Sequence, residues 1–297
     1  MKKAYIKYII SLLIFGSNGI VASYILLSSS EIVLSRTVIG SLFLGLLFLL
    51  GGKRLQMDQI RKQWRYLFGA GVSMGLSWIF LFEAYRLTSV STATLAYYCG
   101  PVIVIALAPF IFKEKVSIAK LCGVLFVAVG MVLVNGADFF AEGISSGLSC
   151  GMVSALLYAV MIVFNKKVKK LTGLESTLAQ LVIAGVIVAF YTLGFEQKSM
   201  VIAKDTIIPI LFLGVVNTGI ACYLYFSSMQ KLPAQSVAIC SYTDPLSALV
   251  FSALILHEHL TVVQLVGACL ILGGAAFGEL YTGKKAKKNP MVSETAA

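Results

Sequence analysis

The chain has 297 residues and a formal net charge of +11, and 59% of its residues are apolar whereas only 12% are charged. Soluble domains carry about 25% charged residues, so this composition, with a mean hydropathy of +0.91, excludes an ordinary soluble protein. Lipid offers no partner to backbone polar groups, which helices satisfy internally. The apolar runs have the length of membrane-spanning helices, about 20 residues, and indicate an all-α integral membrane protein.

The apolar stretches follow one another along the chain, with short polar connections between them. We expect ten membrane-spanning helices, near residues 4–27, 32–51, 66–86, 90–112, 117–135, 144–164, 177–195, 207–228, 234–256 and 262–281. The first begins after Lys2 and Lys3, as a signal peptide does, but its apolar run is longer than a signal core. A basic connection covers residues 52–65, and a polar tail follows the last span.

The basic residues are distributed unevenly over the two sides of the membrane that alternate threading of the spans creates. One side receives 20 of the 24 Lys and Arg residues, namely Lys2, Lys3, Lys7, Lys53, Arg54, Arg61, Lys62, Arg65, Lys113, Lys115, Lys120, Lys166, Lys167, Lys169, Lys170, Lys231 and the four lysines of the tail. Because short basic loops stay in the cytoplasm, we expect a multi-pass plasma-membrane protein with both termini cytoplasmic. The positive charge then reports topology and indicates no nucleic-acid partner.

The reactive residues indicate neither a catalytic site nor a metal site. The cysteines all fall inside predicted spans without a CxxC pair, at Cys99, Cys122, Cys150, Cys222, Cys240 and Cys269, where free cysteines behave as small apolar residues. His257 and His259 flank Glu258, but they point to different sides of a helix and the HExxH spacing is absent. We therefore expect no enzyme, no metal and no cofactor.

An internal repeat appears when the chain is shifted against itself by 144 residues. Punctuation residues then coincide without a gap: Phe82 with Phe226, Tyr98 with Tyr242, Pro101 with Pro245, Glu114 with Glu258, Gly123 with Gly267 and Gly130 with Gly274. Each half holds five predicted spans, so the second half enters the membrane in the opposite orientation. Inverted repeats are a recurring architecture of secondary transporters, with the substrate site near the midplane between the halves.

Together these features resemble the EamA-type transporters of the drug/metabolite transporter superfamily. The resemblance rests on two five-span halves, a Tyr-x-x-Pro in the fourth and ninth spans, the Glu-Lys and Glu-His pairs after them, and glycine-dotted fifth and tenth helices. It implies ten helices around a central cavity walled mainly by the first, third, fourth, sixth, eighth and ninth spans. The repeats would cover residues 1–136 and 144–283, with a cytoplasmic tail at 284–297.

The repeat is broken near the membrane midplane, where Gly100 in the first half corresponds to Asp244 in the second. Asp244 lies roughly 15 Å into the ninth span, and intramembrane carboxylates usually face a cavity or a partner. Pro245 removes a helical N–H, which would free the carbonyl of Ser241 for a ligand, and Pro101 would act likewise in the first half. We expect two kinked helices that form a polar pocket wall. A kink satisfied by neighbouring helices, with Asp244 buried and protonated, is the alternative.

Aromatic and amide side chains in several spans supply the rest of a pocket for a small organic molecule, since such pockets are mostly apolar with a few fixed polar groups. With Asp244, the candidates are Asn18, Trp78, Tyr97, Tyr98, Tyr158, Asn217, Tyr223 and Tyr242. Each has an alternative role in packing, because Tyr also anchors helices at membrane interfaces and Asn bridges helices.

Charged residues also occur near the outer ends of the second and third spans. An intramembrane Arg needs a partner, so we expect Glu83 to pair either with Arg36 or with Arg86, which follows it on the same helix face. The pair would be an external gate or a static brace. Glu114 and Glu258, at symmetric helix ends, are interpreted as structural.

The leading hypothesis is a secondary transporter that exports small organic metabolites such as amino acids by alternating access. Desolvation disfavours a charged carboxylate, so Asp244 would bind a proton and exchange it for a substrate ammonium group. A passive facilitator or metabolite exchanger of the same fold is the alternative. The expected partners are a small-molecule substrate, a proton and the lipid bilayer. A monomer and a homodimer both stay open, because the fifth and tenth helices would pack within one chain or between two.

Overall fold

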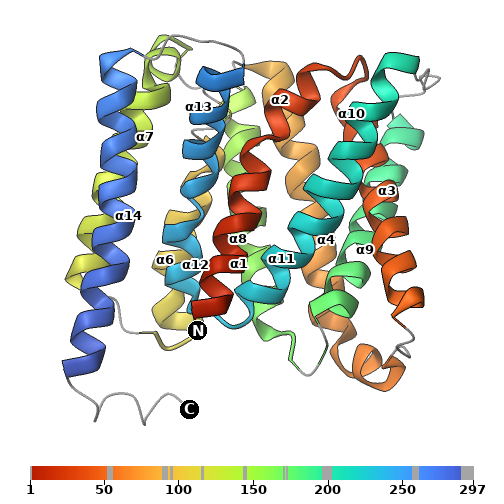
Figure 1. Cartoon of the computed structure of the whole chain (residues 1–297), viewed down its shortest axis with the longest axis horizontal. Coiled ribbons are helices and arrows are strands. Elements are labelled where there is room, and N and C mark those ends of the chain that lie inside the picture. Colours follow the sequence, from red (N-terminus) through yellow and green to blue (C-terminus); the bar gives the residue numbers. More distant parts are fainter. Residues whose placement is uncertain are drawn as a thin grey trace.

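A computed structural model describes residues 2–51, 56–88, 93, 96–114, 117–142, 146–169, 171, 173–195, 203–255 and 261–288. Within these residues the chain is helical and contains no strand (Figure 1). His257, Glu258 and His259, and the tail beyond residue 288, lie outside the described residues, so the expectations placed on them stay predictions.

The helices are α1 (Lys2–Gly16), α2 (Asn18–Ser23), α3 (Ser29–Leu50), α4 (Met57–Leu87), α6 (Cys99–Ile111), α7 (Ile118–Glu142), α8 (Ser146–Lys167), α9 (Gly173–Phe195), the 3-10 helix η1 (Lys204–Thr206), α10 (Ile207–Phe212), the π-helix η2 (Leu213–Ile220), α11 (Ala221–Met229), α12 (Ala234–Cys240), α13 (Thr243–Ile255) and α14 (Val262–Lys288). Six helical stretches of the described chain are long and apolar enough to cross a membrane, and shorter apolar helices lie among them. The protein is therefore a multi-pass helical membrane protein.

Several helices extend beyond the predicted spans. α4 begins at Met57, so residues 57–65 of the predicted basic connection are helical, and α14 continues to Lys288 instead of ending near residue 281. Lys, Arg and Gln are good helix formers, and a helix satisfies its own backbone in water as well as in lipid. Hydropathy reports where the lipid ends, and for this reason it places the start of α4 too late and the end of α14 too early.

Four predicted spans are interrupted. The first divides at Ser17 between α1 and α2, the fourth turns at Tyr98 before α6, and the ninth divides at Ser241 and Tyr242 between α12 and α13. The eighth contains the π-helix η2, a form that is rare and often found at functional sites. Each interruption leaves backbone groups that side chains must satisfy.

Pro101 and Pro245 lie just after two of these interruptions, in the first turns of α6 and α13. The N–H of a first-turn residue has no intrahelical acceptor, so proline is tolerated there. The predicted kinks of continuous helices are therefore breaks, after which a new helix starts.

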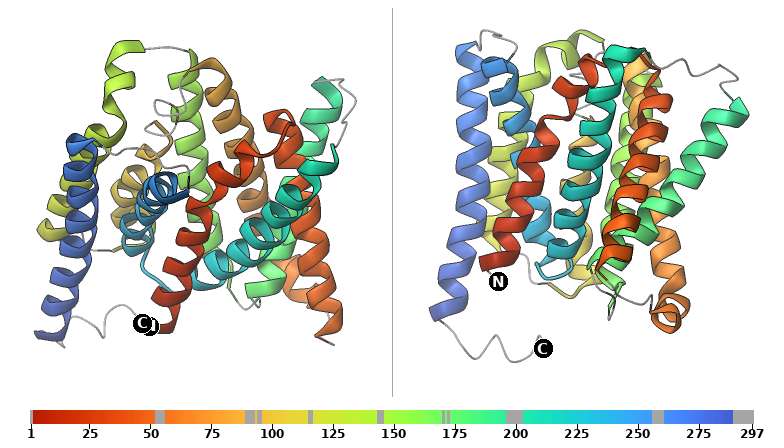
Figure 2. Two further views of the ribbon diagram at one scale, coloured as in Figure 1. Left: turned by 45° about the horizontal axis from the view of Figure 1, so that its top comes forward. Right: turned by 45° about the vertical axis from the view of Figure 1, so that its right-hand side comes forward.

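The pair α7 and α14 stands at one edge of the bundle, and α3 and α9 lie toward the other (Figures 1 and 2). Glycines let α7 and α14 approach: a Cβ on Gly130 would lie 2.6 Å from the carbonyl oxygen of Gly267, and one on Gly274 would lie 2.7 Å from that of Gly123. The predicted fifth and tenth helices thus pack together within one chain. Gly273 faces open space and takes no part in this contact.

Between these edges, α1 packs on α11 and α13, and α6 packs on α8 and α12. A Cβ on Gly16 of α1 would lie 1.9 Å from Oγ of Ser247 in α13. Two serines join α4 to α8: Oγ of Ser77 donates to the carbonyl of Ser154 at 3.0 Å, and Oγ of Ser154 donates to the carbonyl of Ser77 at 2.7 Å. Small residues and interhelical hydrogen bonds are what holds helices together where lipid removes the hydrophobic driving force.

Glu114, which follows α6, joins the two halves of the chain. Its Oε1 and Oε2 accept hydrogen bonds from the backbone N–H groups of Ala234, at 2.7 Å, and Gln235, at 3.2 Å. These are the first N–H groups of α12, so the carboxylate satisfies donors that have no partner within the helix and complements the helix dipole. The contact agrees with the structural role expected for Glu114.

The start of α1 and the end of α14 lie at the same end of the bundle (Figure 1). The break between α1 and α2 and the start of α3 lie toward the opposite end. α3 begins there with a capping box, in which Oγ of Ser28 accepts from the N–H of Glu31 and the Glu31 carboxylate accepts from the N–H of Ser28.

Candidate functional site

Two helix interruptions are joined by one hydrogen bond in the interior of the bundle. The hydroxyl of Tyr242 donates to the backbone carbonyl of Tyr98 at 2.9 Å, and the centroids of their rings lie 6.1 Å apart. Tyr242 is only 1% exposed. It satisfies a backbone carbonyl at the other interruption, so its position is that of a brace, whereas the sequence suggested a substrate contact.

The carbonyl of Ser241 is not left free for a ligand, contrary to the prediction. The backbone N–H of Asp244 donates to it at 3.1 Å, because the chain turns through Ser241 and Tyr242 before α13 begins. The prediction assumed a continuous helix, in which only the missing N–H of Pro245 would reach this carbonyl.

The Asp244 side chain lies beside the two interruptions. The phenol of Tyr98 is within hydrogen-bonding reach of its carboxylate, and Tyr97 and Tyr158 are close enough to experience its charge. Asp244, Tyr97 and Tyr98 keep part of their surface accessible although protein surrounds them. From this combination of enclosure and accessible surface, we infer that the three side chains border an internal space.

Arg36, which is only 7% exposed, extends from α3 toward the same region. Its Nε donates to Oγ1 of Thr218 at 2.9 Å, and its Nη2 donates to Oδ1 of Asn18 at 3.4 Å. The guanidinium carbon lies 5.2 Å from the ring centroid of Trp78, a cation–π distance. The charges of Arg36 and Asp244 act on each other. The family resemblance did not include the second predicted span, here α3, among the helices that wall the cavity. It therefore did not predict this position of Arg36.

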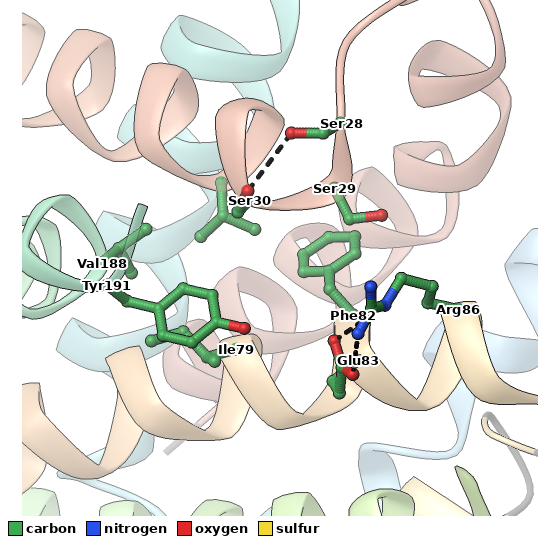
Figure 3. A pocket seen from close by; sticks show the side chains of 10 residues that line it. Ser28, Ser29, Ser30, Ile79, Phe82, Glu83, Arg86, Val188 and Tyr191 are labelled. Atoms are coloured by element: carbon green, nitrogen blue, oxygen red, sulfur yellow. Dashed lines mark hydrogen bonds and ion pairs between the residues drawn. The ribbon is translucent and has the colours of Figure 1, made fainter. Parts of the chain in front are cut away.

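Glu83 pairs with Arg86, the second of the two predicted arrangements. Nε of Arg86 donates to Oε2 of Glu83 at 3.1 Å, and its Nη2 contacts Oε1. Arg36 is directed instead to Thr218, Asn18 and the Trp78 ring. The Glu83–Arg86 pair borders a cavity of about 320 Å³ that is also lined by the start of α3 and by α9 (Figure 3).

A buried network of hydroxyl groups centres on Ser241. Its Oγ lies 2.9 Å from the hydroxyl of Tyr8 and 2.9 Å from that of Tyr158, and the latter hydroxyl lies 3.0 Å from that of Tyr225. The ring of Tyr158 also packs against Tyr97, at 5.4 Å between centroids. The network ties α1, α8 and α11 to the end of α12, and it supports the aromatic side chains that border the internal space.

Asn217 lies in η2 and is fully buried. Its Nδ2 donates to the carbonyl of Ile14 and to the hydroxyl of Ser17, both at 2.9 Å, and thereby satisfies the break between α1 and α2. The neighbouring Thr218 hydroxyl donates to a carbonyl of the π-helix at 2.9 Å and accepts from Arg36. Of the two predicted amides, Asn18 contacts Arg36, whereas Asn217 holds helices together.

Tyr223 lies apart from the other candidates. It lines a cavity of about 550 Å³ together with Lys3, Lys7 and Lys231, and none of the residues around Asp244 lines that cavity. Burial and contacts thus bring Asn18, Trp78, Tyr97, Tyr98, Tyr158 and Asp244 together with Arg36. Tyr242 and Asn217 lie beside this group and join helices, whereas Tyr223 lies apart from it.

Sequence reasoning missed Tyr8, Tyr225, Thr218 and the side chain of Ser241. Each is a hydroxyl residue within an apolar run, which is a signal that a polar partner is needed. Hydroxyl residues are common in membrane helices and often bond to their own backbone, so this signal alone could not indicate which of them meet.

A buried carboxylate and a buried guanidinium beside interrupted helices, within a helical membrane bundle, are typical of a transport site. The sequence pattern of the EamA-like transporter family matches residues 2–136 and again residues 145–278. The chain belongs to the EamA-like transporter family. Its role is therefore transport across a membrane and not enzymatic catalysis.

Several known proteins are similar to this EamA-like transporter over most of their length. The chain is 27% identical over 276 residues to the uncharacterized transporter YxxF of Bacillus subtilis, covering 92% of this chain and 88% of that protein. It is 22% identical to the uncharacterized inner membrane transporter YicL of Salmonella typhimurium, covering 96% and 98%. It is 25% identical over 219 residues to a protein of Salmonella typhimurium named "Probable amino-acid metabolite efflux pump", covering 70% and 73%.

A solved crystal structure has the same fold as this EamA-like transporter. The two superpose with a TM-score of 0.82 at 19% sequence identity, covering 95% of this chain and 98% of the other.

Proposed function

We propose that this EamA-like transporter is a secondary exporter of small organic metabolites such as amino acids, and that Asp244 exchanges a proton for the substrate during alternating access. The observation that carries the proposal is the Asp244 carboxylate, which lies just after a helix interruption, is surrounded by protein and keeps part of its surface accessible. The relative named as an amino-acid metabolite efflux pump supports the substrate class.

The proposed architecture is a pair of inverted repeats, residues 1–136 and 144–283, in the plasma membrane. The separate family matches in the two halves support the repeats, and the excess of basic residues on one side supports cytoplasmic termini and a cytoplasmic tail at 284–297. The packing of α7 on α14 within one chain means that a monomer is sufficient for this contact, and a homodimer stays compatible with it.

The exchange follows from the cost of a buried charge. Without a counter-ion, an enclosed carboxylate is best stabilised by binding a proton. A substrate ammonium group that enters the internal space would pair with the carboxylate and displace that proton. One carboxylate binds either cation but not both, so the proton and the substrate cross the membrane in opposite directions. Tyr98 would orient the carboxylate for either partner.

Glu83 is proposed to act at the end of the path that lies near the start of α3. Its ion pair with Arg86 borders the cavity there, between α3, α4 and α9 (Figure 3). Arg86 is largely exposed, with 72% of its side chain accessible, so opening this pair would cost little. This position suits a gate.

The alternative function, a passive facilitator or a metabolite exchanger, would share the fold but would not need Asp244 to change its protonation. The test uses purified full-length protein in proteoliposomes with a panel of amino acids and other metabolites. In the Asp244→Asn variant, we expect uphill transport driven by a pH gradient to be lost, while exchange of substrate for substrate persists. Asp205→Asn is the matched control, because Asp205 is exposed in η1. Uphill transport that persists in Asp244→Asn would leave the facilitator or exchanger.

A further inference from the structure

Two opposite charges are enclosed in the interior of the bundle without forming an ion pair. Asp244 starts α13 and Arg36 lies in α3, and each experiences the charge of the other. In the part of the chain that the structure describes, no nitrogen of Arg36 lies within 4.0 Å of a carboxylate oxygen. Tyr97 is close to both charges, and its ring packs against Tyr158, so the aromatic side chains of the site lie near both charges.

The protein partners of both charges are neutral. Arg36 is held by the Thr218 hydroxyl, the Asn18 amide oxygen and the Trp78 ring, which use its Nε, its Nη2 and one face of its guanidinium plane. A guanidinium carries five N–H donors in a planar fork that matches a carboxylate, and its Nη1 makes no hydrogen bond with the described residues. A buried ion without a counter-ion is unfavourable, so each charge is prepared for a partner that the chain itself does not supply.

We propose that the substrate is a zwitterion, and that Arg36 binds the substrate carboxylate while Asp244 binds the ammonium group. This inference rests on the proposed transport function and adds Arg36 as a specificity-determining residue. A free α-amino acid has the required chemistry. A simple amine would leave Arg36 without a counter-ion, and a simple carboxylic acid would leave Asp244 protonated and without an ammonium partner. Both should therefore bind more weakly than the amino acid.

The aromatic side chains near the two charges suit an apolar substrate side chain. Trp78, Tyr97 and Tyr98 keep accessible surface, and the Tyr97 ring packs 5.4 Å from the Tyr98 ring and 5.4 Å from the Tyr158 ring. Aromatic walls bind apolar and aromatic groups without demanding one shape. The charged pair would thus recognise the common part of an amino acid, and the rings would accept the variable part.

The competing interpretation is that Arg36 only braces α3 against α2, α4 and η2. A brace predicts a loss of stability on mutation, and it predicts no change in the choice between an amino acid, an amine and an acid. Ligand selectivity therefore separates the two interpretations.

The experiment titrates purified full-length protein with three ligands that share one side chain. The side chain is chosen first, by finding which of the twenty amino acids raises the melting temperature of the protein most. The ligands are this amino acid, its decarboxylated amine and its deaminated carboxylic acid, for leucine 3-methylbutylamine and 4-methylpentanoate. Binding is measured by calorimetry. We expect the amino acid to bind about 10- to 100-fold more tightly than either analogue, the scale of one hydrogen-bonded charge contact.

The two variants should change selectivity in opposite ways. Arg36→Gln should weaken binding of the amino acid by the same factor, so that the amino acid binds no more tightly than the amine. Asp244→Asn should weaken it until the amino acid binds no more tightly than the carboxylic acid. Arg65→Gln and Asp205→Asn, both exposed, serve as matched controls and should bind like the wild type. If Arg36→Gln is not monodisperse, Arg36→Lys keeps the charge but loses the planar fork, and it should retain the preference for the amino acid at reduced affinity.

An amine or an acid that binds as tightly as the amino acid to the wild type overturns the proposal, as does a lack of response to all twenty amino acids. An unchanged selectivity in Arg36→Gln, or in Arg36→Lys with wild-type affinity, returns Arg36 to a brace. These outcomes are distinct from failure of the proposed function: proton-driven transport of a simple amine that depends on Asp244 would keep the transport function and reject the zwitterion.

Discussion

The break that precedes α6 and the break that precedes α13 have the same punctuation but different chemistry. Tyr98 and Tyr242 mark the two breaks, and Pro101 and Pro245 restart the helices in their first turns. Between the tyrosine and the proline, Gly100 lies in the first turn after one break and Asp244 in the first turn after the other. A Cβ on Gly100 would lie 2.7 Å from the ring of Tyr158 and 3.0 Å from a backbone carbonyl oxygen of α8, whereas Asp244 borders an internal space.

The difference shows how an internal repeat can supply one asymmetric site. The backbone repeats because both halves need a helix that stops and restarts. The side chains differ because α8 packs directly on the first break, which leaves room only for hydrogen, while the second break has room for a carboxylate. Of the two corresponding positions, only the second carries an acid, which suits the proposed exchange of one proton for one substrate.

Moving the acid to the other break should have the largest effect on folding. Gly100→Asp would force a charged side chain against Tyr158 and the backbone of α8, and an uncompensated buried charge costs about 3–5 kcal/mol. We expect a strongly lowered melting temperature and loss of the monodisperse species in size-exclusion chromatography. The reverse exchange, Asp244→Gly, is the matched control and should stay folded, at a cost near 1 kcal/mol. Equal stability of the two variants would mean that the breaks are packed alike.

The two tyrosines at the breaks should separate stability from function. Tyr242→Phe removes the donor to the partly buried carbonyl of Tyr98, and an unsatisfied buried acceptor costs about 1–3 kcal/mol, so we expect a loss toward the lower end of that range. Tyr98→Phe removes a partner of Asp244 and leaves that bond intact, so it should lower substrate affinity with little change in thermal unfolding. Calorimetric unfolding and ligand titration of both variants check this division. A larger loss of stability in Tyr98→Phe would reverse the assignment of the two hydroxyl groups.

The helix that leads into the second break should depend on Glu114, with the smallest effect. Glu114→Ala removes two hydrogen bonds to the first N–H groups of α12, and loss of a helix cap costs typically about 1 kcal/mol. We expect a small fall in melting temperature with unchanged selectivity among ligands. An exposed carboxylate of α4, Asp58, is the control for removal of an acid. A change in ligand selectivity in Glu114→Ala would show that the cap also determines the geometry of the break.

The helical membrane fold could be predicted because lipid forces apolar runs to form helices, and the family resemblance followed from the spacing of a few Tyr, Pro, Glu and Gly residues. The breaks themselves could be located at Pro101 and Pro245. Their form could not, because a continuous helix with a proline kink and a helix that restarts at its first turn require the same residues. The prediction of a free carbonyl at Ser241 was wrong for this reason.

The surroundings of Arg36 lay beyond sequence reasoning. Charge alone suggested Glu83 as its partner, and two residues that hold it, Thr218 and Asn18, are neutral and come from distant parts of the chain. A π-helix at 213–220 turns the Thr218 hydroxyl toward Arg36 while the adjacent Asn217 satisfies the break after α1, and no sequence signal distinguishes this form from an ordinary helix. For Asn217, the contacts favour the alternative role of joining helices, which the sequence had left open beside a place in the pocket.

The exchange of a proton for substrate at Asp244 is tested most directly by following both together. Proteoliposomes that enclose a pH-sensitive dye are loaded with the amino acid identified by binding, and efflux is started by dilution without an imposed pH gradient. With wild-type protein, we predict that the vesicle interior acidifies as the amino acid leaves. With Asp244→Asn, exchange of labelled for unlabelled amino acid should continue while the acidification disappears. Acidification of the same size in the Asn variant would contradict the role assigned to this carboxylate.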